Sequence, residues 1–183
     1  MNKCTDAYYV EKIQAGETEC FAALLERYGQ SVFSLIFKIT GNREDAEELT
    51  QDVFLKVFRS LSSFQGNSLF STWLYRIAYN VAVSATRKKK MEWLAIEESM
   101  IENATAIETN DEMEQIDKEE QLCRLDKAVG QLPPDERALV SLFYLQEKPV
   151  EEIVMITGLS HSNVKTKLHR IRKKLWIIMQ SMA

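Results

Sequence analysis

Residues 150–176 carry the sequence VEEIVMITGLSHSNVKTKLHRIRKKLW, which predicts a short helix, a tight turn at Gly158 and a second helix. Glycine adopts the left-handed backbone conformation of such a turn without steric cost. Ser160 stands where a helix N-cap is preferred. The second helix holds six lysine and arginine residues and no acidic residue. This layout is typical of a helix-turn-helix that reads DNA.

The second helix of this stretch separates its apolar and polar residues by angle. At about 100° per residue, the apolar side chains form a single stripe: Val164, Leu168, Ile171 and Leu175. A helix of this kind buries one face, meets base edges with the opposite face and meets phosphates with its flanks. The side chains expected to contact DNA are Lys165, Thr166, Lys167, His169, Arg170, Arg172, Lys173 and Lys174. The alternative is an ordinary solvent-exposed basic helix.

The composition predicts an all-α, cytoplasmic protein. The 183 residues include only 3 Pro and 6 Gly, and Val and Ile recur mostly at helical spacing. No apolar run approaches the ~18 residues of a membrane span, and the N-terminal residues lack the apolar core of a signal peptide. Cys4, Cys20 and Cys123 are scattered and odd in number. That pattern favours reduced thiols over a disulfide framework or a metal site.

Charge is distributed unevenly along the chain, although the net charge is only -4. Residues 91–120 contain eleven acidic residues and one lysine, whereas the remainder contains 16 acidic and 22 basic residues. An acidic middle therefore separates two more basic ends. Charge asymmetry of this kind indicates a charged partner, and basic ends favour nucleic acid.

The periodicity predicts two small helical domains joined by a flexible acidic linker. We assign residues 1–90 to the first domain, 91–117 to the linker and 118–183 to the second domain, which contains the helix-turn-helix. The expected helices cover residues 5–15, 18–39, 43–62, 71–90, 112–130, 135–146, 150–157 and 161–178.

The helix over 71–90 combines aromatic, basic and amide side chains. Its expected buried stripe comprises Leu74, Ile77, Ala78, Val81 and Ala85, and the opposite face includes Thr72 and Val83. Aromatics interleaved with basic residues suit single-stranded DNA, because unpaired bases stack and phosphates are neutralised. The candidate contacts are Phe64, Asn67, Phe70, Trp73, Arg76, Tyr79, Asn80 and Arg87. The alternative is that Phe70 and Trp73 belong to the core.

The helix over 43–62 has apolar residues on two sides. Ala46, Leu49, Val53 and Val57 form the inward stripe. The outer side combines carboxylates with large apolar residues, a mixture that favours a protein partner. The candidate contacts on this outer side are Glu48, Gln51, Asp52, Leu55 and Phe58. A helix buried on two sides within a bundle would show the same pattern.

Two stretches resemble regions 2 and 4 of bacterial extracytoplasmic-function sigma factors, which belong to the sigma-70 family. They are ELTQDVFLKVFRSLSSFQGNSLFSTWLYRIAYNVAVSATRKKK (48–90) and LPPDERALVSLFYLQEKPVEEIVMITGLSHSNVKTKLHRIRKKL (132–175). The resemblance implies a protein that is not an enzyme and has no cofactor or small-molecule substrate. It implies binding to core RNA polymerase, opening of the -10 promoter element by region 2 and recognition of the -35 element by region 4. It also implies an anti-sigma factor as a partner, often a membrane-anchored one.

The resemblance assigns roles to matching residues. Gln51, Asp52 and Leu55 match positions that contact the polymerase clamp. The residues that match the loop and helix holding the -10 strand are Phe64, Asn67, Phe70, Trp73, Arg76 and Asn80, and those that match the -35 readers are Lys165, Thr166, His169 and Arg170.

The chain departs from the family pattern at three positions. Val154 replaces the usual alanine where the two helices of the helix-turn-helix cross, and its larger side chain is expected to push them apart. Lys165 and Lys167 replace arginines. Lysine does not form the planar bidentate contact to guanine that arginine forms, so we expect these two to contact phosphates.

Two alternatives remain at the level of sequence. A stand-alone helix-turn-helix regulator with an N-terminal sensor domain would bind duplex DNA without polymerase, but it would not need the aromatic and basic helix over 71–90. The sequence lacks a P-loop, a GxGxxG motif, an HExxH motif and a Ser-His-Asp cluster, which disfavours an enzyme. The acidic linker either imitates a nucleic-acid backbone in a basic channel or acts only as a solubilising spacer.

Overall fold

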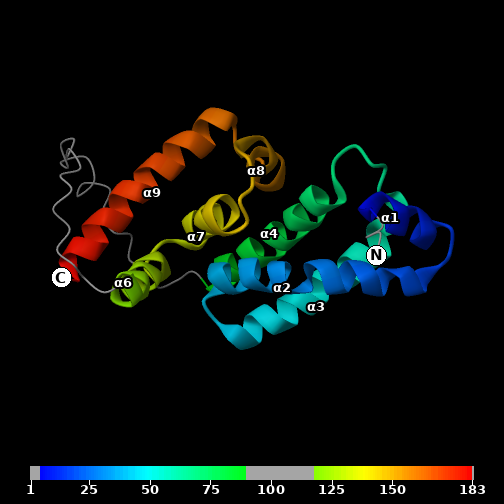
Figure 1. The fold of residues 1–183 in the computed structure, drawn as a ribbon, viewed down its shortest axis with the longest axis horizontal. Helices are drawn as coiled ribbons and strands as arrows, with labels where there is room; N and C mark the ends of the chain where they lie inside the picture. Colours follow the sequence, from blue (N-terminus) through cyan, green and yellow to red (C-terminus); the bar gives the residue numbers. More distant parts are fainter. Residues whose placement is uncertain (1–4, 90–117, 183) are drawn as a thin grey trace.

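The computed structural model describes residues 5–89 and 118–182, and every regular element within them is helical. The N-terminal half comprises α1 (Asp6–Gln14), the 3-10 turn η1 (Thr18–Cys20), α2 (Phe21–Thr40), α3 (Arg43–Ser60), the 3-10 turn η2 (Leu61–Ser63) and α4 (Phe70–Lys89). The C-terminal half comprises α6 (Lys118–Gly130), α7 (Pro134–Val140), the π-helical turn η3 (Ser141–Leu145), α8 (Val150–Thr157) and α9 (His161–Ser181) (Figure 1). The expected all-α class is confirmed.

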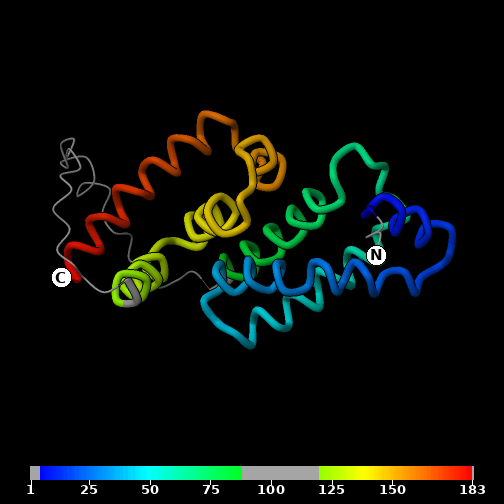
Figure 2. The backbone as a smooth tube through the Cα atoms, viewed as in Figure 1, coloured from blue at the N-terminus to red at the C-terminus, as the bar shows by residue number. Residues whose placement is uncertain are grey.

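Helix α2 organises the N-terminal half. It packs against both α3 and α4, which also contact each other, and its buried side chains include Leu35, Ile36 and Ile39. The chain turns sharply from α2 into α3, as the backbone trace shows (Figure 2). Gly41 ends α2 with a φ of 70°, and the Asn42 side chain caps α3 by accepting a hydrogen bond from the Asp45 amide at 2.9 Å. The sequence predicts both the end of α2 at Gly41 and the cap of α3 at Asn42.

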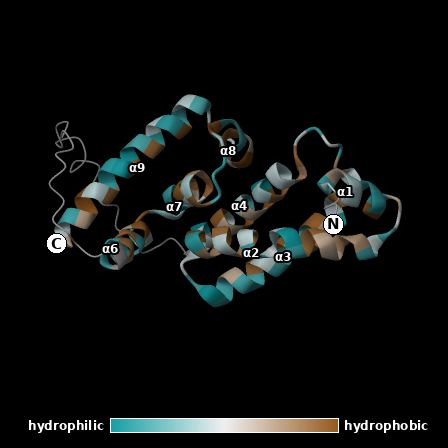
Figure 3. Ribbon diagram, viewed as in Figure 1, coloured by the Kyte–Doolittle hydropathy of each residue, from teal (hydrophilic) through white to brown (hydrophobic). Residues whose placement is uncertain are grey.

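The C-terminal half forms the expected helix-turn-helix. Gly158 ends α8 with a φ of 75°, and the Ser160 hydroxyl caps α9 by accepting from the Asn163 amide at 3.3 Å. The predicted apolar stripe of α9 is confirmed, because Val164, Leu168, Ile171 and Leu175 are all buried. Hydrophilic residues cover much of the rest of α9 (Figure 3). Val154 of α8 is partly buried and packs against the core.

Several expected helix boundaries required correction, because 3-10 turns occupy Thr18–Cys20 before α2 and Leu61–Ser63 after α3. The helix predicted over 135–146 is divided into α7 and the π-helical turn η3, in which the Gln146 amide donates to the Ser141 carbonyl at 2.9 Å. Helix α9 continues to Ser181, three residues beyond the predicted end, and Ile178 belongs to its buried stripe. The acidic linker expected over 91–117 lies outside the described residues.

The two halves contact each other directly. Helix α4 packs against α8, and α2 packs against α7. This packing corrects the expected outer face of α4, because Thr72 and Val83 are buried. Helices that lie far along the chain bury this side of α4, so the periodicity of the α4 sequence could not indicate that it is buried.

Candidate nucleic-acid interface

Three aromatic rings form a cluster at the start of α4. The rings of Phe64 and Trp73 lie 4.9 Å apart between centroids, and that of Phe70 lies 6.2 Å and 6.0 Å from them. Phe64 and Trp73 are half-buried and offer part of their surface to solvent. Phe70 is buried, 4% exposed, with the Tyr28 ring 5.7 Å away. Phe70 therefore supports the other two rings and does not itself present a face to a base, which corrects its assignment as a contact.

Polar side chains continue from this cluster along one side of α4. Arg76, Asn80 and Arg87 are exposed, and Asn67 is exposed in the preceding loop. Tyr79 is half-buried toward α7, and its pKa is raised by burial and by the nearby carboxylate of Asp135. The exposed side chains therefore form a narrow strip with aromatic rings at one end and guanidinium groups along it. We call Phe64, Trp73, Arg76, Asn80 and Arg87 the α4 strip.

Helix α1 supports the loop that leads into the α4 strip. The Gln14 side chain donates hydrogen bonds to the Leu61 carbonyl at 2.9 Å and to the Phe64 carbonyl at 3.0 Å. An open hollow of about 740 Å³ lies between α1 and this loop, and Gln14, Phe64, Gly66 and Leu69 are among its lining residues. No pattern in the sequence indicates this role, because Gln14 contacts residues almost fifty positions away.

We expect Gln14→Ala to weaken binding of a single-stranded DNA oligonucleotide by roughly tenfold. Two hydrogen bonds of about 1 kcal/mol each hold the loop, and their loss frees the backbone of Phe64. Fluorescence anisotropy of the full chain measures the effect, and Glu19→Ala, an exposed change in η1, serves as the control. Unchanged affinity in Gln14→Ala would show that the loop keeps its position without α1.

Helix α9 presents its predicted DNA face to solvent. Lys165, Thr166, His169, Arg170 and Arg172 are exposed, and Lys173 is half-buried. The Ser160 cap and the short α8 leave the first turns of α9 at the edge of the molecule (Figure 1). An exposed N-terminal part with basic side chains suits insertion of a recognition helix into the major groove.

One flank of α9 pairs with α7 instead of facing solvent. Lys174 Nζ lies 2.7 Å from a carboxylate oxygen of Glu136, and both side chains are largely buried, 16% and 13% exposed. Lys167 Nζ lies 3.2 Å from Asp135, with more of both side chains exposed. Lys174 therefore holds α9 against α7, which corrects its assignment as a phosphate contact. The opposite flank, with Lys165 and Arg172, stays open.

The outer side of α3 is exposed. Glu48, Gln51 and Asp52 face solvent, and Leu55 and Phe58 are 53% and 41% exposed despite their apolar side chains. The Phe58 ring meets Phe21 edge to face at 5.1 Å, which fixes its orientation. The alternative of a helix buried on two sides is therefore wrong for α3. Exposed apolar residues among carboxylates indicate a protein-binding surface.

The described residues contain neither a cluster of side chains suited to a metal ion nor a helix long and apolar enough to cross a membrane. Cys20 and Cys123 are free thiols, and Cys4 lies outside the described part of the chain.

Comparison with protein families finds two matches in the expected order. Residues 24–92 match the family model of Sigma-70 region 2, and residues 124–175 match that of Sigma-70, region 4. The chain is 31% identical over 177 residues to the ECF RNA polymerase sigma-E factor of Escherichia coli strain K12, covering 93% of this chain and 92% of the relative. It is 27% identical over 172 residues to the ECF RNA polymerase sigma factor SigW of Bacillus subtilis, covering 91% and 92%.

Solved structures share the fold at lower sequence identity. CnrH in complex with the cytosolic domain of CnrY matches with a TM-score of 0.71 and 19% identity, covering 97% of this chain and 99% of that chain. The sigma factor RpoE in complex with the anti-sigma factor NepR, from Bartonella quintana, matches with a TM-score of 0.64 and 21% identity, covering 87% and 96%.

Proposed function

The chain belongs to the sigma-70 family as an extracytoplasmic-function sigma factor that directs transcription initiation, and we propose which of its surfaces carries each step. Residues 1–90 form region 2, residues 118–183 form region 4, and residues 91–117 link them. The α4 strip holds the melted -10 strand. Half-buried rings of Phe64 and Trp73 stack on unpaired bases, while Arg76 and Arg87 neutralise phosphates. The main support for this proposal is that the polar residues of the strip are exposed next to the packed rings of Phe64 and Trp73.

Helix α9 reads the -35 element as duplex DNA. Arg170 and His169 lie opposite the buried stripe, where they meet base edges in the major groove, and Thr166 lies beside them. Lys165 and Arg172 lie on the open flank and contact phosphates. Because Lys174 is paired with Glu136, the phosphate contacts of α9 lie mainly on one side.

The outer side of α3 contacts core RNA polymerase. Its carboxylates and amide fix the orientation of the contact, and Leu55 and Phe58 bury apolar surface against the partner. This division leaves α4 and α9 free for promoter DNA. The alternative function, a stand-alone regulator with a sensor domain, does not explain why residues 24–92 match Sigma-70 region 2.

We expect the double change Gln51→Ala and Asp52→Ala to weaken binding to core RNA polymerase by roughly tenfold or more. Both side chains are exposed, so helicity is expected to stay unchanged. Loss of interface contacts at a few central residues commonly costs about 2 kcal/mol. Gel filtration and a titration against purified core polymerase measure the effect. The matched control is Glu26→Ala with Gln30→Ala on the exposed side of α2. Equal binding of both double variants would place the polymerase contact elsewhere.

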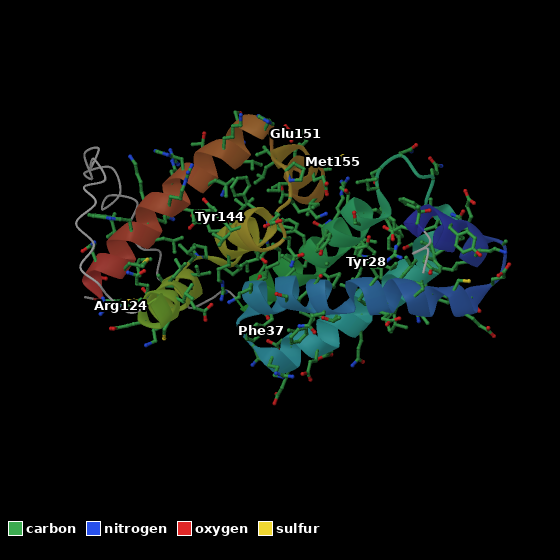
Figure 4. The ribbon with its side chains drawn as sticks, viewed as in Figure 1. Tyr28, Phe37, Arg124, Tyr144, Glu151 and Met155 are labelled. Carbon is green, nitrogen blue, oxygen red and sulfur yellow. The ribbon has the colours of Figure 1, made fainter. Side chains whose placement is uncertain are left out.

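An anti-sigma factor is a further partner that we propose for this chain. Two proteins of the same fold were solved with protein partners, the sigma factor RpoE with the anti-sigma factor NepR and CnrH with the cytosolic domain of CnrY. Exposed apolar side chains provide surface for such a partner, including Tyr144 of η3 and Met155 of α8 (Figure 4). The partner either is soluble or is anchored in the membrane with a domain facing the cytoplasm, where the sigma factor meets polymerase and DNA.

A further inference from the structure

Two carboxylates from neighbouring helices lie beside the basic flanks of α9. Helix α9 itself carries no acidic residue, but Asp135 of α7 and Glu151 of α8 each contact one of its side chains. We call these two residues the flank carboxylates. We propose that the flank carboxylates limit the affinity of α9 for DNA of any sequence, because they hold basic side chains that phosphates bind. The proposal rests on the function given above for α9.

The first flank carboxylate pairs with Lys167. Lys167 Nζ lies 3.2 Å from a carboxylate oxygen of Asp135 and donates a hydrogen bond to it. The two residues are 32 positions apart, so the packing of α7 against α9 brings them together. Lys167 directly precedes Leu168 of the buried stripe and therefore lies on a flank of α9, where a lysine reaches phosphates. In the free chain its ammonium group is directed at Asp135 instead.

The second flank carboxylate lies near the start of α9, on the other flank. A carboxylate oxygen of Glu151 lies 3.4 Å from His161 Nε2, and this contact becomes an ion pair when the imidazole is protonated. A hydrogen bond from its own backbone amide lowers the pKa of Glu151, and His161 and the charge of Lys165 lower it further. Glu151 is therefore ionised at neutral pH beside Lys165, one of the proposed phosphate contacts.

Both flank carboxylates also occupy the first turn of a helix. Asp135 belongs to the first turn of α7, and Glu151 belongs to that of α8. The helix dipole stabilises an acidic side chain in this position, whatever lies beyond it. This local role requires no partner on another helix, whereas the contacts with Lys167 and His161 cross to α9. The two roles predict different results, since only the second depends on a basic side chain of α9.

Solvent exposure distinguishes the flank carboxylates from Glu136, the other carboxylate that faces α9. The side chains of Lys167 and Asp135 are 38% and 44% exposed, and that of Glu151 is 73% exposed. Glu136 and its partner Lys174 are largely buried. Exposed pairs break at small cost, whereas breaking a buried pair leaves an uncompensated charge. The flank carboxylates therefore yield to phosphates, and Glu136 keeps Lys174 in place.

Binding of DNA exchanges the contacts of the flank carboxylates for contacts with phosphates. Each exchange gains less affinity than an unopposed phosphate contact, because the pair with the carboxylate is lost. It also releases fewer ions, since the freed carboxylate attracts a cation while the phosphate gives one up. Phosphate contacts supply nearly all of the binding to DNA that is not a promoter. The flank carboxylates therefore lower the occupancy of such DNA by the chain and leave the choice of bases to the exposed face of α9.

The experiment measures duplex binding by the full chain after each flank carboxylate is neutralised. Asp135→Asn and Glu151→Gln keep the size and polarity of the side chain and remove one negative charge. The probes are a duplex that the parent chain selects from a random library and a scrambled duplex of the same composition. We expect each variant to bind both duplexes roughly twofold to fivefold more tightly, with an unchanged ratio between them. The salt dependence should become steeper by up to about one counterion.

Fluorescence anisotropy at several salt concentrations measures both quantities. Glu26→Gln, on the exposed side of α2, is the matched control because it changes the net charge equally and lies outside the helix-turn-helix. An equal gain in this control would overturn the proposal, since net charge alone would then explain the effect. Unchanged affinity in both neutralised variants with parental helicity would overturn it as well.

A double-mutant cycle tests whether Asp135 acts through its partner on α9. In a chain that already carries Lys167→Ala, the further change Asp135→Asn should alter the affinity much less than it does in the parent. Such a loss of the effect supports the pairing. An equal gain in both backgrounds would overturn it, because the carboxylate would then repel phosphates without holding Lys167. Glu151→Gln, at an exposed position, carries the test should Asp135→Asn fail to fold.

The outcomes separate the role of the flank carboxylates from the proposed function of α9. Tighter binding of both duplexes, with the parental preference retained, supports the proposal. A neutralised variant that preferred a different sequence would contradict it, because the carboxylate would then contact a base. A parent chain that selects no sequence from the library overturns the function of α9 as a reader. In that case the gain in binding to any duplex still decides whether the flank carboxylates limit affinity.

Discussion

Replacing Asn80 with alanine is expected to abolish the preference of the chain for a cognate -10 strand over a scrambled strand. Asn80 is exposed in the middle of the α4 strip, and its amide offers both a donor and an acceptor to the edge of an unpaired base. A site built on such hydrogen bonds discriminates bases by roughly 1–3 kcal/mol per good bidentate contact. Competition anisotropy with the two oligonucleotides measures the preference, and affinity for -35 duplex should stay at the parental value.

The matched control for this prediction is Ser84→Ala. Ser84 is exposed on the next turn of α4, so its substitution tests whether any polar deletion on this side has the same effect. Phe64→Ala should also lose the preference, because stacking contributes about 1–3 kcal/mol per base and Phe64 supports Trp73. Retained selectivity in Asn80→Ala together with Phe64→Ala would contradict the assignment of the α4 strip.

Arg170→Ala is expected to lower affinity for the -35 duplex by roughly tenfold to a hundredfold and to relax the preference at one base pair. Arg170 projects from the open face of α9, and a bidentate contact to guanine is worth about 1–3 kcal/mol of discrimination. Arg172→Ala provides the contrast, because Arg172 lies on the open flank. That variant should bind all sequences more weakly and lower the salt dependence by about one counterion.

The two arginine variants should therefore differ in kind across a set of -35 duplexes and salt concentrations. If Arg170→Ala weakened every duplex equally, Arg170 would be a phosphate contact and α9 would dock in a different rotation. Val154→Ala is the first further variant to test in that case, because a smaller side chain in α8 would change the packing of the helix-turn-helix. Lys174 is unsuited to this contrast, since its substitution also breaks the largely buried pair with Glu136.

Local patterns in the sequence were sufficient to predict most of the helices and several of their ends. The apolar stripe of α9, the cap at Ser160 and the turn at Gly158 each depend on residues within a few positions, so periodicity and capping rules predicted them. The exposed outer side of α3 was visible as a second stripe. The sequence could not decide whether this second stripe is exposed, because a helix buried on two sides within a bundle has the same pattern of apolar residues.

Contacts between distant segments account for what the sequence did not predict. Thr72 is buried by a helix that begins nearly eighty residues later, and Lys174 pairs with a carboxylate on α7, 38 positions earlier. Gln14 reaches a loop 47 to 50 positions ahead. None of these partners shares a helix with the residue concerned. Each correction to the candidate site therefore comes from packing between elements and not from a wrong helix assignment.

Transcription by purified core RNA polymerase on a library of promoter fragments tests the central claim most directly. With the parent chain, we expect transcripts from fragments that share a -10 and a -35 motif at fixed spacing. Asn80→Ala should relax selection of the first motif only, and Arg170→Ala should relax selection of the second only. Transcripts that were no more selective than those from core polymerase alone would contradict the account, as would two variants that lost the same motif.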